Sequence, residues 1–225
     1  MENWLFTGKS DKRDLLLYIC KVLSGSGNRV LLVDMTDGKK YRYLIGEMKA
    51  SLPITEFCGF DICDNVSIAE AGHYDYCLYD LETLQFGSRE LWEGADAVLW
   101  VTSYDRYEVE SSAEWFAHLF LRWPQLKDLE IKPVFIRTFD GFLNADYIMG
   151  FVEHLPVYWS GQAVQIPWSE TNAIVQMENE HAQSLRMRGI SRAYKKALMS
   201  LIVDLAGWSG SLTKKALRMA ERKRA

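Results

Sequence analysis

The sequence predicts a single soluble α/β domain built on a doubly wound, mostly parallel sheet of about seven or eight strands flanked by helices. Two observations support this prediction. Short, almost purely apolar runs recur along the chain, and such runs are typical of strands buried on both faces of a parallel sheet. Segments with helical spacing of apolar residues lie between them, and this alternation is typical of βαβ units with right-handed crossovers. The length of 225 residues suits one such domain.

Six segments are predicted as strands because they are short and apolar, and two of them end in a carboxylate, Asp34 and Asp80. Between the second and third strands, residues 41–74 are less regular and are expected to hold a short hairpin or helix. The predicted strands cover residues 4–6, 29–34, 76–80, 97–102, 132–138 and 163–166.

Three amphipathic segments are predicted as helices, at residues 11–23, 111–123 and 184–206. We expect the α/β domain to span residues 1–207 and a basic tail helix to span residues 208–225. Ligands of open parallel sheets bind at the carboxyl ends of the strands. The loops that follow Phe6, Asp34 and Asp80 are therefore the first places to look for a site.

Composition excludes several classes of protein. The net charge of −4 argues against a protein built wholly around nucleic acid. Cys58 and Cys63 are spaced too widely for a zinc knuckle, so all four cysteines are expected to be structural thiols and no metal site is predicted. No apolar run reaches the length of a membrane span, and Glu2 and Asn3 replace the basic start of a signal peptide. We therefore expect a cytoplasmic location.

The segment from Phe6 to Asp14 links a predicted strand to a predicted helix, which is where a phosphate-binding loop belongs. Such a loop uses glycines to bring backbone N–H groups to the phosphates, a lysine for the β- and γ-phosphates, and a hydroxyl for Mg²⁺. Here only Gly8 is present, and no Gly-Lys-Ser/Thr opens the helix. By its own residues, therefore, the segment does not match the motif.

The spacing around this segment nevertheless resembles the opening of ParA/MinD proteins, a SIMIBI-class family with a deviant Walker A loop. In that family the loop leads through one helix into a strand that ends Val-Leu-Leu-Val-Asp, and residues 30–34 read the same without a gap. Residues 74–80 are similar to the Walker B strand, and residues 134–140 to the strand whose end contacts the base. Further similar segments are 95–102 and 165–168, so that the resemblance covers roughly residues 3–205.

The resemblance implies a P-loop NTPase fold of the ParA/MinD type, with ATP and Mg²⁺ as the family's ligands. Lys12 falls at the phosphate-loop lysine, Asp80 at the Walker B aspartate, and Arg137 on the strand near the base. By this resemblance the nucleotide-binding candidates are Gly8, Lys9, Lys12, Arg13, Asp34, Asp80 and Arg137.

Several positions depart from the family pattern. Thr7 stands where the family has its signature lysine, which Lys9 could replace, and Asp11 stands where the family has a glycine. Arg13 and Asp14 occupy the two threonine positions, so the hydroxyl that holds Mg²⁺ is missing. A carboxylate at position 11 would repel phosphates at close range.

The water-orienting element is changed as well. Thr36 replaces its second aspartate, for which the adjacent Asp37 could substitute. Because phosphoryl transfer depends on positioning and charge neutralisation, these losses predict no efficient hydrolysis. No catalytic residue is assigned, and Asp37 and Lys9 are interpreted as vestigial. ATP binding without turnover and no nucleotide at all stay open, as does the simpler interpretation that Asp34 and Asp80 cap loops and Lys12 is solvated.

The last residues form a basic, weakly amphipathic segment, with Leu212 and Leu217 in a narrow apolar stripe. Three interpretations stay open: a frayed and solvated helix, an anchor to an acidic membrane as in MinD-type proteins, or a contact with DNA phosphates. The cations that such a tail would present to a membrane or partner are Lys214, Lys215, Arg218 and Arg222.

The function implied by the resemblance is a non-hydrolytic localisation or scaffold factor for a bacterial pilus, secretion or partition machinery, close to the TadZ/CpaE group. One alternative is an active ATPase in which Lys9, Lys12 and Asp37 rebuild the site and ATP drives dimerisation. Another is a structural subunit of a secretion or envelope complex. Protein partners, including a second copy, are expected, nucleic acid is not, and a peripheral position at the inner face of the membrane accompanies the cytoplasmic expectation.

Overall fold

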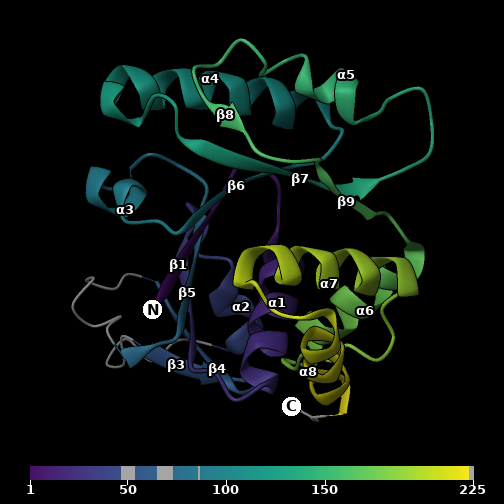
Figure 1. Cartoon of the computed structure of the whole chain (residues 1–225). Helices are drawn as coiled ribbons and strands as arrows, with labels where there is room; N and C mark the ends of the chain where they lie inside the picture. Colours follow the sequence, from purple (N-terminus) through teal and green to yellow (C-terminus); the bar gives the residue numbers. More distant parts are fainter. Residues whose placement is uncertain (47–53, 65–72, 86, 223–225) are drawn as a thin grey trace.

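The computed structural model describes residues 1–46, 54–64, 73–85 and 87–222, and within them the strands form one twisted nine-stranded sheet (Figure 1). The main path runs β3-β4-β2-β5-β1-β6-β7-β8, and β9 pairs with β7 beside β8. All pairs are parallel except the β3–β4 hairpin. The strands are β1 Glu2–Thr7, β2 Val30–Met35, β3 Ile54–Phe57, β4 Phe60–Cys63, β5 Tyr76–Leu81, β6 Ala97–Thr102, β7 Glu130–Thr138, β8 Tyr158–Trp159 and β9 Val164–Pro167.

The predicted fold class is confirmed, including the six strands. Residues 41–74, expected to hold a short hairpin or helix, contain both the β3–β4 hairpin and the short helix α2. One further strand, β8, was not predicted, because it has only two residues. Most of residues 41–74 that belong to neither the hairpin nor α2 lie outside the described residues.

Helices cover both faces of the sheet (Figure 1). Alternate residues of β2 show why the strand is apolar throughout: Leu32 joins the core under α1, α7 and α8, whereas Leu31 and Val33 join the core under α3, α4 and α5. The helices are α1 Arg13–Gly25, α2 Tyr41–Ile45, α3 Arg89–Glu93, α4 Arg106–Arg122, α5 Ala145–Met149, α6 Glu170–His181, α7 Arg192–Ala206 and α8 Gly210–Arg222, with a 3-10 turn at Pro124–Leu126.

None of the three predicted helices begins at the residue that its apolar spacing predicted. Helix α1 begins at residue 13 and not 11, because residues 8–12 form the loop after β1. Helix α4 begins five residues before the predicted start because the Asp105 carboxylate caps it by accepting the backbone N–H of Glu108. Helix α7 begins at residue 192 and not 184, where the Ser191 hydroxyl accepts the N–H of Tyr194. Capping groups, therefore, set the last two of these boundaries.

Helix α8 contains most of the predicted tail and packs against α1 (Figure 1). Of the predicted apolar stripe, Ala216, Leu217 and Ala220 are buried in the same core as α1 and α7, and Thr213 is buried beside them. Leu212 is not part of the buried side, because it is 41% exposed. The solvated-tail interpretation is therefore wrong for residues 210–222. Among the described residues no helix has both the length and the apolar character needed to cross a bilayer.

Candidate nucleotide site

The loop between β1 and α1 starts at Gly8, at the carboxyl edge of the sheet. Gly8 has a φ of +123°, and a Cβ added there would lie 2.3 Å from the carbonyl oxygen of Val101 on β6. Its N–H donates to the carbonyl of Leu81 at 3.2 Å. Glycine is thus required here by the close approach of two neighbouring strands, whether or not a phosphate binds.

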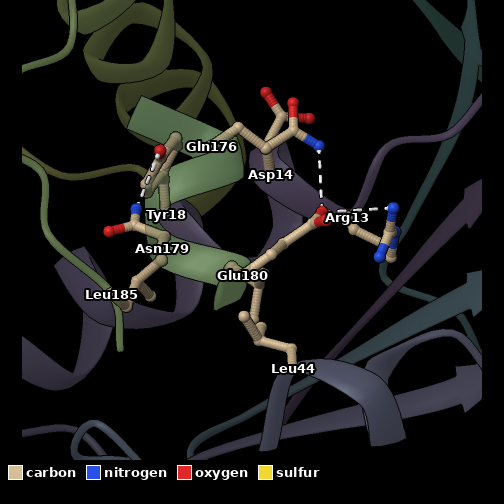
Figure 2. Close-up of a pocket in the computed structure, with 9 residues that line it drawn as sticks. Arg13, Asp14, Tyr18, Leu44, Gln176, Asn179, Glu180 and Leu185 are labelled. Carbon is tan, nitrogen blue, oxygen red and sulfur yellow. Dashed lines mark hydrogen bonds and ion pairs between the residues drawn. The ribbon is translucent and has the colours of Figure 1, made fainter. Parts of the chain in front are cut away.

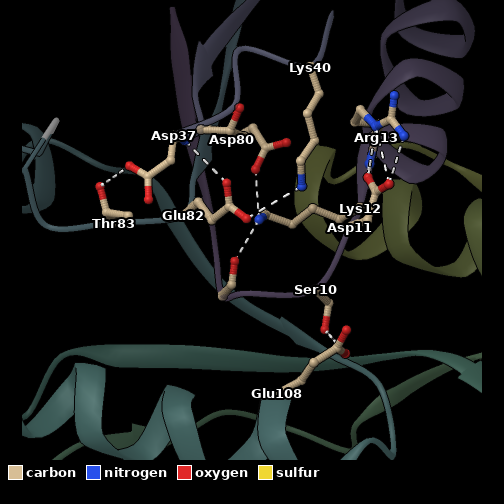
Figure 3. Close-up of polar contacts among 12 residues, drawn as sticks. Ser10, Asp11, Lys12, Arg13, Asp37, Lys40, Asp80, Glu82, Thr83 and Glu108 are labelled. Carbon is tan, nitrogen blue, oxygen red and sulfur yellow. Dashed lines mark hydrogen bonds and ion pairs between the residues drawn. The ribbon is translucent and has the colours of Figure 1, made fainter.

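Lys12 ends the loop, and its ammonium group points back under it (Figure 3). The Nζ atom lies 2.7 Å from Oδ1 of Asp80 and donates to the Gly8 carbonyl at 2.8 Å. The side chains of Lys12 and Asp80 are only 1% and 2% exposed. The charge that the family pattern assigns to a phosphate is therefore neutralised inside the protein.

The carboxylate of Asp80 has a second partner, contributed by α2. The hydroxyl of Tyr41 donates to Oδ2 of Asp80 at 2.8 Å, and the Tyr41 backbone N–H donates to Oδ2 of Asp34 at 3.4 Å. The other oxygen of Asp34 accepts the N–H and the hydroxyl of Thr36, at 3.0 and 2.6 Å. One tyrosine thereby joins the two strand-end carboxylates to α2.

Burial shapes the titration of this cluster. It raises the pKa of Asp34, an effect that the Thr36 hydrogen bonds oppose and the nearby charge of Asp80 reinforces. Burial, together with the Asp80 charge, also raises the pKa of Tyr41 well above its ordinary value. Tyr41 consequently remains a hydrogen-bond donor to Asp80 at neutral pH.

Arg13, the first residue of α1, is engaged by two carboxylates. Its guanidinium donates to both oxygens of Asp11, at 2.9 and 2.8 Å, and lies 3.2 Å from Oε1 of Glu180 on α6. Burial alone would raise the pKa of Asp11, but the hydrogen bonds and charge of Arg13 outweigh it and lower this pKa to about 2. Asp11 therefore keeps a negative charge in the loop at neutral pH.

A second anchor holds the loop to α4. The buried Ser10 hydroxyl donates to Oε2 of Glu108 at 2.5 Å and accepts the N–H of Ser103 at 3.1 Å (Figure 3). The Ser103 hydroxyl donates to the same Glu108 oxygen at 2.6 Å. Sequence reasoning missed Ser10, Glu108 and Tyr41 as site residues, because only the tertiary fold brings them together at the loop.

The two residues interpreted as vestigial catalytic groups make no hydrogen bond or ion pair with Lys12 or Asp80 in the part of the chain that the structure describes. Asp37 accepts the Thr83 hydroxyl at 3.3 Å, and its N–H donates to Glu82 at 3.2 Å (Figure 3). Lys9 is partly exposed, and no hydrogen bond or ion pair to it is found in the described part of the chain.

Arg137 stands at the other side of the loop. It occupies a bulge in β7 between Ile136 and Thr138 with a φ of +55°, a conformation that residues with a side chain rarely adopt. Its Nη2 donates to the Asp11 carbonyl at 2.8 Å. The bulge turns the arginine out of the strand and toward the loop.

Next to Arg137 lies an open cavity between β7, β9, α6 and α7. Tyr194 donates its hydroxyl to Oδ2 of Asp14 there at 2.9 Å, and burial raises the pKa of Asp14. Trp168, which follows β9, is 59% exposed. The main lining residues are Asp14, Ile136, Arg137, Pro167, Trp168, Asn172 and Tyr194.

A smaller cavity lies on the other side of Asp14, between α1, α2 and α6 (Figure 2). Arg13 and Glu180 meet at one side of it, and Asn179 donates toward the hydroxyl of Tyr18 at 3.4 Å at the other. Leu44 and Leu185 supply apolar walls. Polar contacts therefore connect α6 to α1, and residues of α6 line both cavities.

These residues do not fit a magnesium–triphosphate. Lys12 is bound to Asp80, the Asp11 carboxylate stays ionised beside the loop, and Arg13 and Asp14 supply no hydroxyl for the metal. Within the described ranges no group of three or more His, Cys, Asp or Glu side chains could hold a metal ion. The loop carries its own internal counter-charges.

Comparison with known proteins bears on the fold. No family model and no curated protein matches the sequence. MinD in the MinC:MinD cell division complex of Aquifex aeolicus is similar in structure, with a TM-score of 0.59 and 14% identity over 99% of this chain and 95% of the other. The chain has the ParA/MinD fold. A ParA-family ATPase from Chlorobium tepidum has a TM-score of 0.56 and 13% identity over 97% and 98% of the chains. A variant of Cyanothece McdA in complex with ATP has a TM-score of 0.57 and 12% identity over 93% and 97%.

Within this fold the structure brings Gly8, Lys12 and Asp80 into direct contact and joins Asp34 to them through Tyr41. Arg13 and Arg137 meet the loop through Asp11, whereas Lys9 and Asp37 take no part in this cluster. The predicted positions are gathered at one edge of the sheet, but their contacts are mostly with each other.

Proposed function

We propose that this chain is a ParA/MinD-like localisation or scaffold factor that does not hydrolyse ATP. It would serve a bacterial pilus, secretion or partition machinery from the cytoplasm or the inner face of the membrane. Placement near the TadZ/CpaE group is part of the same proposal. The MinD, ParA-family and McdA structures support it through the fold they share with this chain.

The observation that carries the proposal is the buried Lys12–Asp80 ion pair. A triphosphate on the loop would have to draw Lys12 away from Asp80 and leave a buried carboxylate without its cation. Breaking a buried pair in this way typically costs about 3–5 kcal/mol. In the family's chemistry Mg²⁺ would offset such a cost, but positions 13 and 14 offer it no hydroxyl.

The ionised Asp11 adds to this cost. Its carboxylate is held beside the loop by Arg13, whose own charge is already shared between Asp11 and Glu180. Phosphate oxygens approaching the loop would meet a like charge in a partly desolvated place, where electrostatic interactions are stronger than in water. A protein with such a loop is expected to act through its surface.

One alternative has an observation in its favour. Lys9 lies on the loop without a described partner, so it could meet a phosphate, and an ATPase would then use ATP-dependent dimerisation to control positioning. Two measurements separate the alternatives. Calorimetry with adenosine and with ATP plus Mg²⁺ measures what the triphosphate adds, and light scattering with and without ATP measures dimerisation.

Under the proposal, we expect ATP with Mg²⁺ to bind no more tightly than adenosine and no phosphate to be released. The mass measured in solution should be the same with and without ATP. Phosphate release from Mg²⁺-ATP, or a mass that doubles when ATP is added, would overturn it if Lys9→Ala abolished the effect. Binding of Mg²⁺-ATP at least about tenfold tighter than adenosine, a difference of about 1.4 kcal/mol, would contradict the closed loop on which the proposal rests. Lys9→Ala is the preferred control because this partly exposed residue makes no described contact that folding needs.

A further inference from the structure

Charge is strongly segregated along this chain. Residues 185–225 contain 11 Lys and Arg and 2 Asp and Glu, a net +9, so the other residues carry 15 basic and 28 acidic groups, a net −13. Both acids of the basic segment are already paired, Asp204 with Lys132 and Glu221 with Lys195. Helices α7 and α8 therefore present an excess of cations on an otherwise acidic protein.

The orientation of α8 is fixed by its packing. Ala216 and Ala220 lie against Gly25 at the end of α1, so closely that a Cβ on Gly25 would be 3.2 Å from the Ala216 carbonyl oxygen. Leu217 is buried between the same helices. This side of α8 is therefore unavailable to a lipid bilayer while the helix is docked.

The opposite side of α8 is exposed and regular. Leu212, Lys215, Met219 and Arg222 follow one another at spacings of three, four and three residues, which places them in one stripe along the helix. Leu212 and Met219 are 41% and 39% exposed. The exposed cations Lys214 and Arg218 flank the stripe, and further exposed cations on α7 and the segment before it are Arg188, Arg192 and Lys196.

We propose that this outward stripe of α8 docks an acidic amphipathic helix of a partner protein. A phosphate polymer would use the cations alone. A membrane anchor needs a broad apolar face, and the outward side offers only Leu212 and Met219 because Ala216, Leu217 and Ala220 are buried against the core. A helix with apolar and acidic side chains one turn apart pairs with both kinds of residue in the stripe. Met and Arg are enriched in protein interfaces, and the complementary charge would steer the encounter. This inference does not depend on the proposed function.

The test uses the full chain and a synthetic, helix-stabilised peptide of about 18 residues, whose leucines are spaced as Leu212 and Met219 are and are flanked by glutamates. Fluorescence anisotropy of the labelled peptide is expected to report micromolar binding that weakens with salt. Lys215→Glu with Arg218→Glu, and separately Met219→Ser with Leu212→Ser, should each weaken binding about tenfold or more.

Matched controls lie on α4 and the turn after it, where Leu121→Ser and Lys127→Glu change an exposed apolar and an exposed basic residue and should leave binding unchanged. The melting temperature of every variant should stay near that of the parent chain, since none of the changed side chains is buried. Two results would overturn the inference. One is peptide binding that stays unchanged when Met219 and Leu212 are replaced. The other is tight binding of a DNA duplex or of anionic vesicles by a chain that does not bind the peptide.

Discussion

The loop at residues 8–12, with the first residue of α1, and the ends of β7 and β9 lie at the same edge of the sheet but differ in how their polar groups are used. In the first region, Lys12 and Arg13 are bound by carboxylates of the chain itself. At the ends of β7 and β9, Arg137 and Trp168 border an open cavity, and the indole of Trp168 is largely exposed. In the first region the charged groups are paired within the chain, whereas the second region borders a cavity.

This difference shows that polar groups at one edge of a sheet can be paired within the chain in one place and border a cavity in another. The helix after the loop and the strand-end aspartates that the sequence predicts are both present. In the loop, the positive charges have their partners inside the chain. We therefore expect substitutions in the loop to affect stability strongly, and those around the cavity to affect it little.

Lys12→Ala should have the largest effect. Removing the ammonium leaves Asp80 buried without its cation, which is expected to lower the free energy of unfolding by about 3–5 kcal/mol. Arg137→Ala, the matched change beside the cavity, removes an exposed side chain and should lower it by less than about 1 kcal/mol. Urea denaturation measures both, and equal losses would erase the contrast between the regions.

Gly8→Ala should be the next most damaging. The new methyl would meet the Val101 carbonyl at 2.3 Å, and neither strand can move without breaking its ladder. We expect a loss of about 2–3 kcal/mol by urea denaturation. Gly27→Ala is the control, because Gly27 also has a positive φ, +95°, but has nothing within 4 Å of the added methyl. Its smaller loss, about 1 kcal/mol, measures backbone strain alone.

Asp11→Asn should cost about 1–2 kcal/mol at neutral pH, after allowance for the partial exposure of its pair with Arg13. The folded-state pKa is about 2 and the ordinary value is 3.8, so this stability is fully present above the ordinary value and is lost as pH falls toward 2. Thermal unfolding from pH 7 to pH 2 should show the variant and parent converging. A constant difference would mean that the charge of Asp11 is not what matters.

Asp14→Asn should have the smallest effect and the opposite sign. Burial raises the pKa of Asp14, so its ionised form is disfavoured in the fold, and this penalty grows as pH rises from the ordinary value toward the folded-state pKa. An asparagine can still accept the Tyr194 hydroxyl without the charge. The variant should melt slightly higher than the parent at pH 7 and at the same temperature near pH 3. A lower melting temperature at pH 7 would contradict this account.

Most of the fold could be predicted because the strands of a parallel sheet appear in the sequence as apolar runs such as Val30–Val33. Helix α6 could not, because only Val175 and Asn179 among its residues are buried and its apolar spacing is weak. The start of α4 was readable in principle from Asp105 and Glu108, which stand three residues apart as in a capping motif.

The candidate site was predictable in place but not in chemistry. The family spacing predicted that Lys12 and Asp80 lie in the same site. Nothing in the sequence shows, however, that the two side chains form an ion pair with each other instead of binding a ligand. The roles of Tyr41 and Glu108 arise from segments far from the loop in sequence. Such contacts are set by tertiary packing, which local patterns do not encode.

A crystal structure of the chain grown with millimolar ATP and Mg²⁺ tests the central claim most directly. We expect Lys12 Nζ to stay between the Asp80 carboxylate and the Gly8 carbonyl, with no triphosphate on the loop. A triphosphate seated at the start of α1, with Lys12 turned from Asp80 toward the phosphates and Mg²⁺ beside Asp34 or Asp80, would contradict the account.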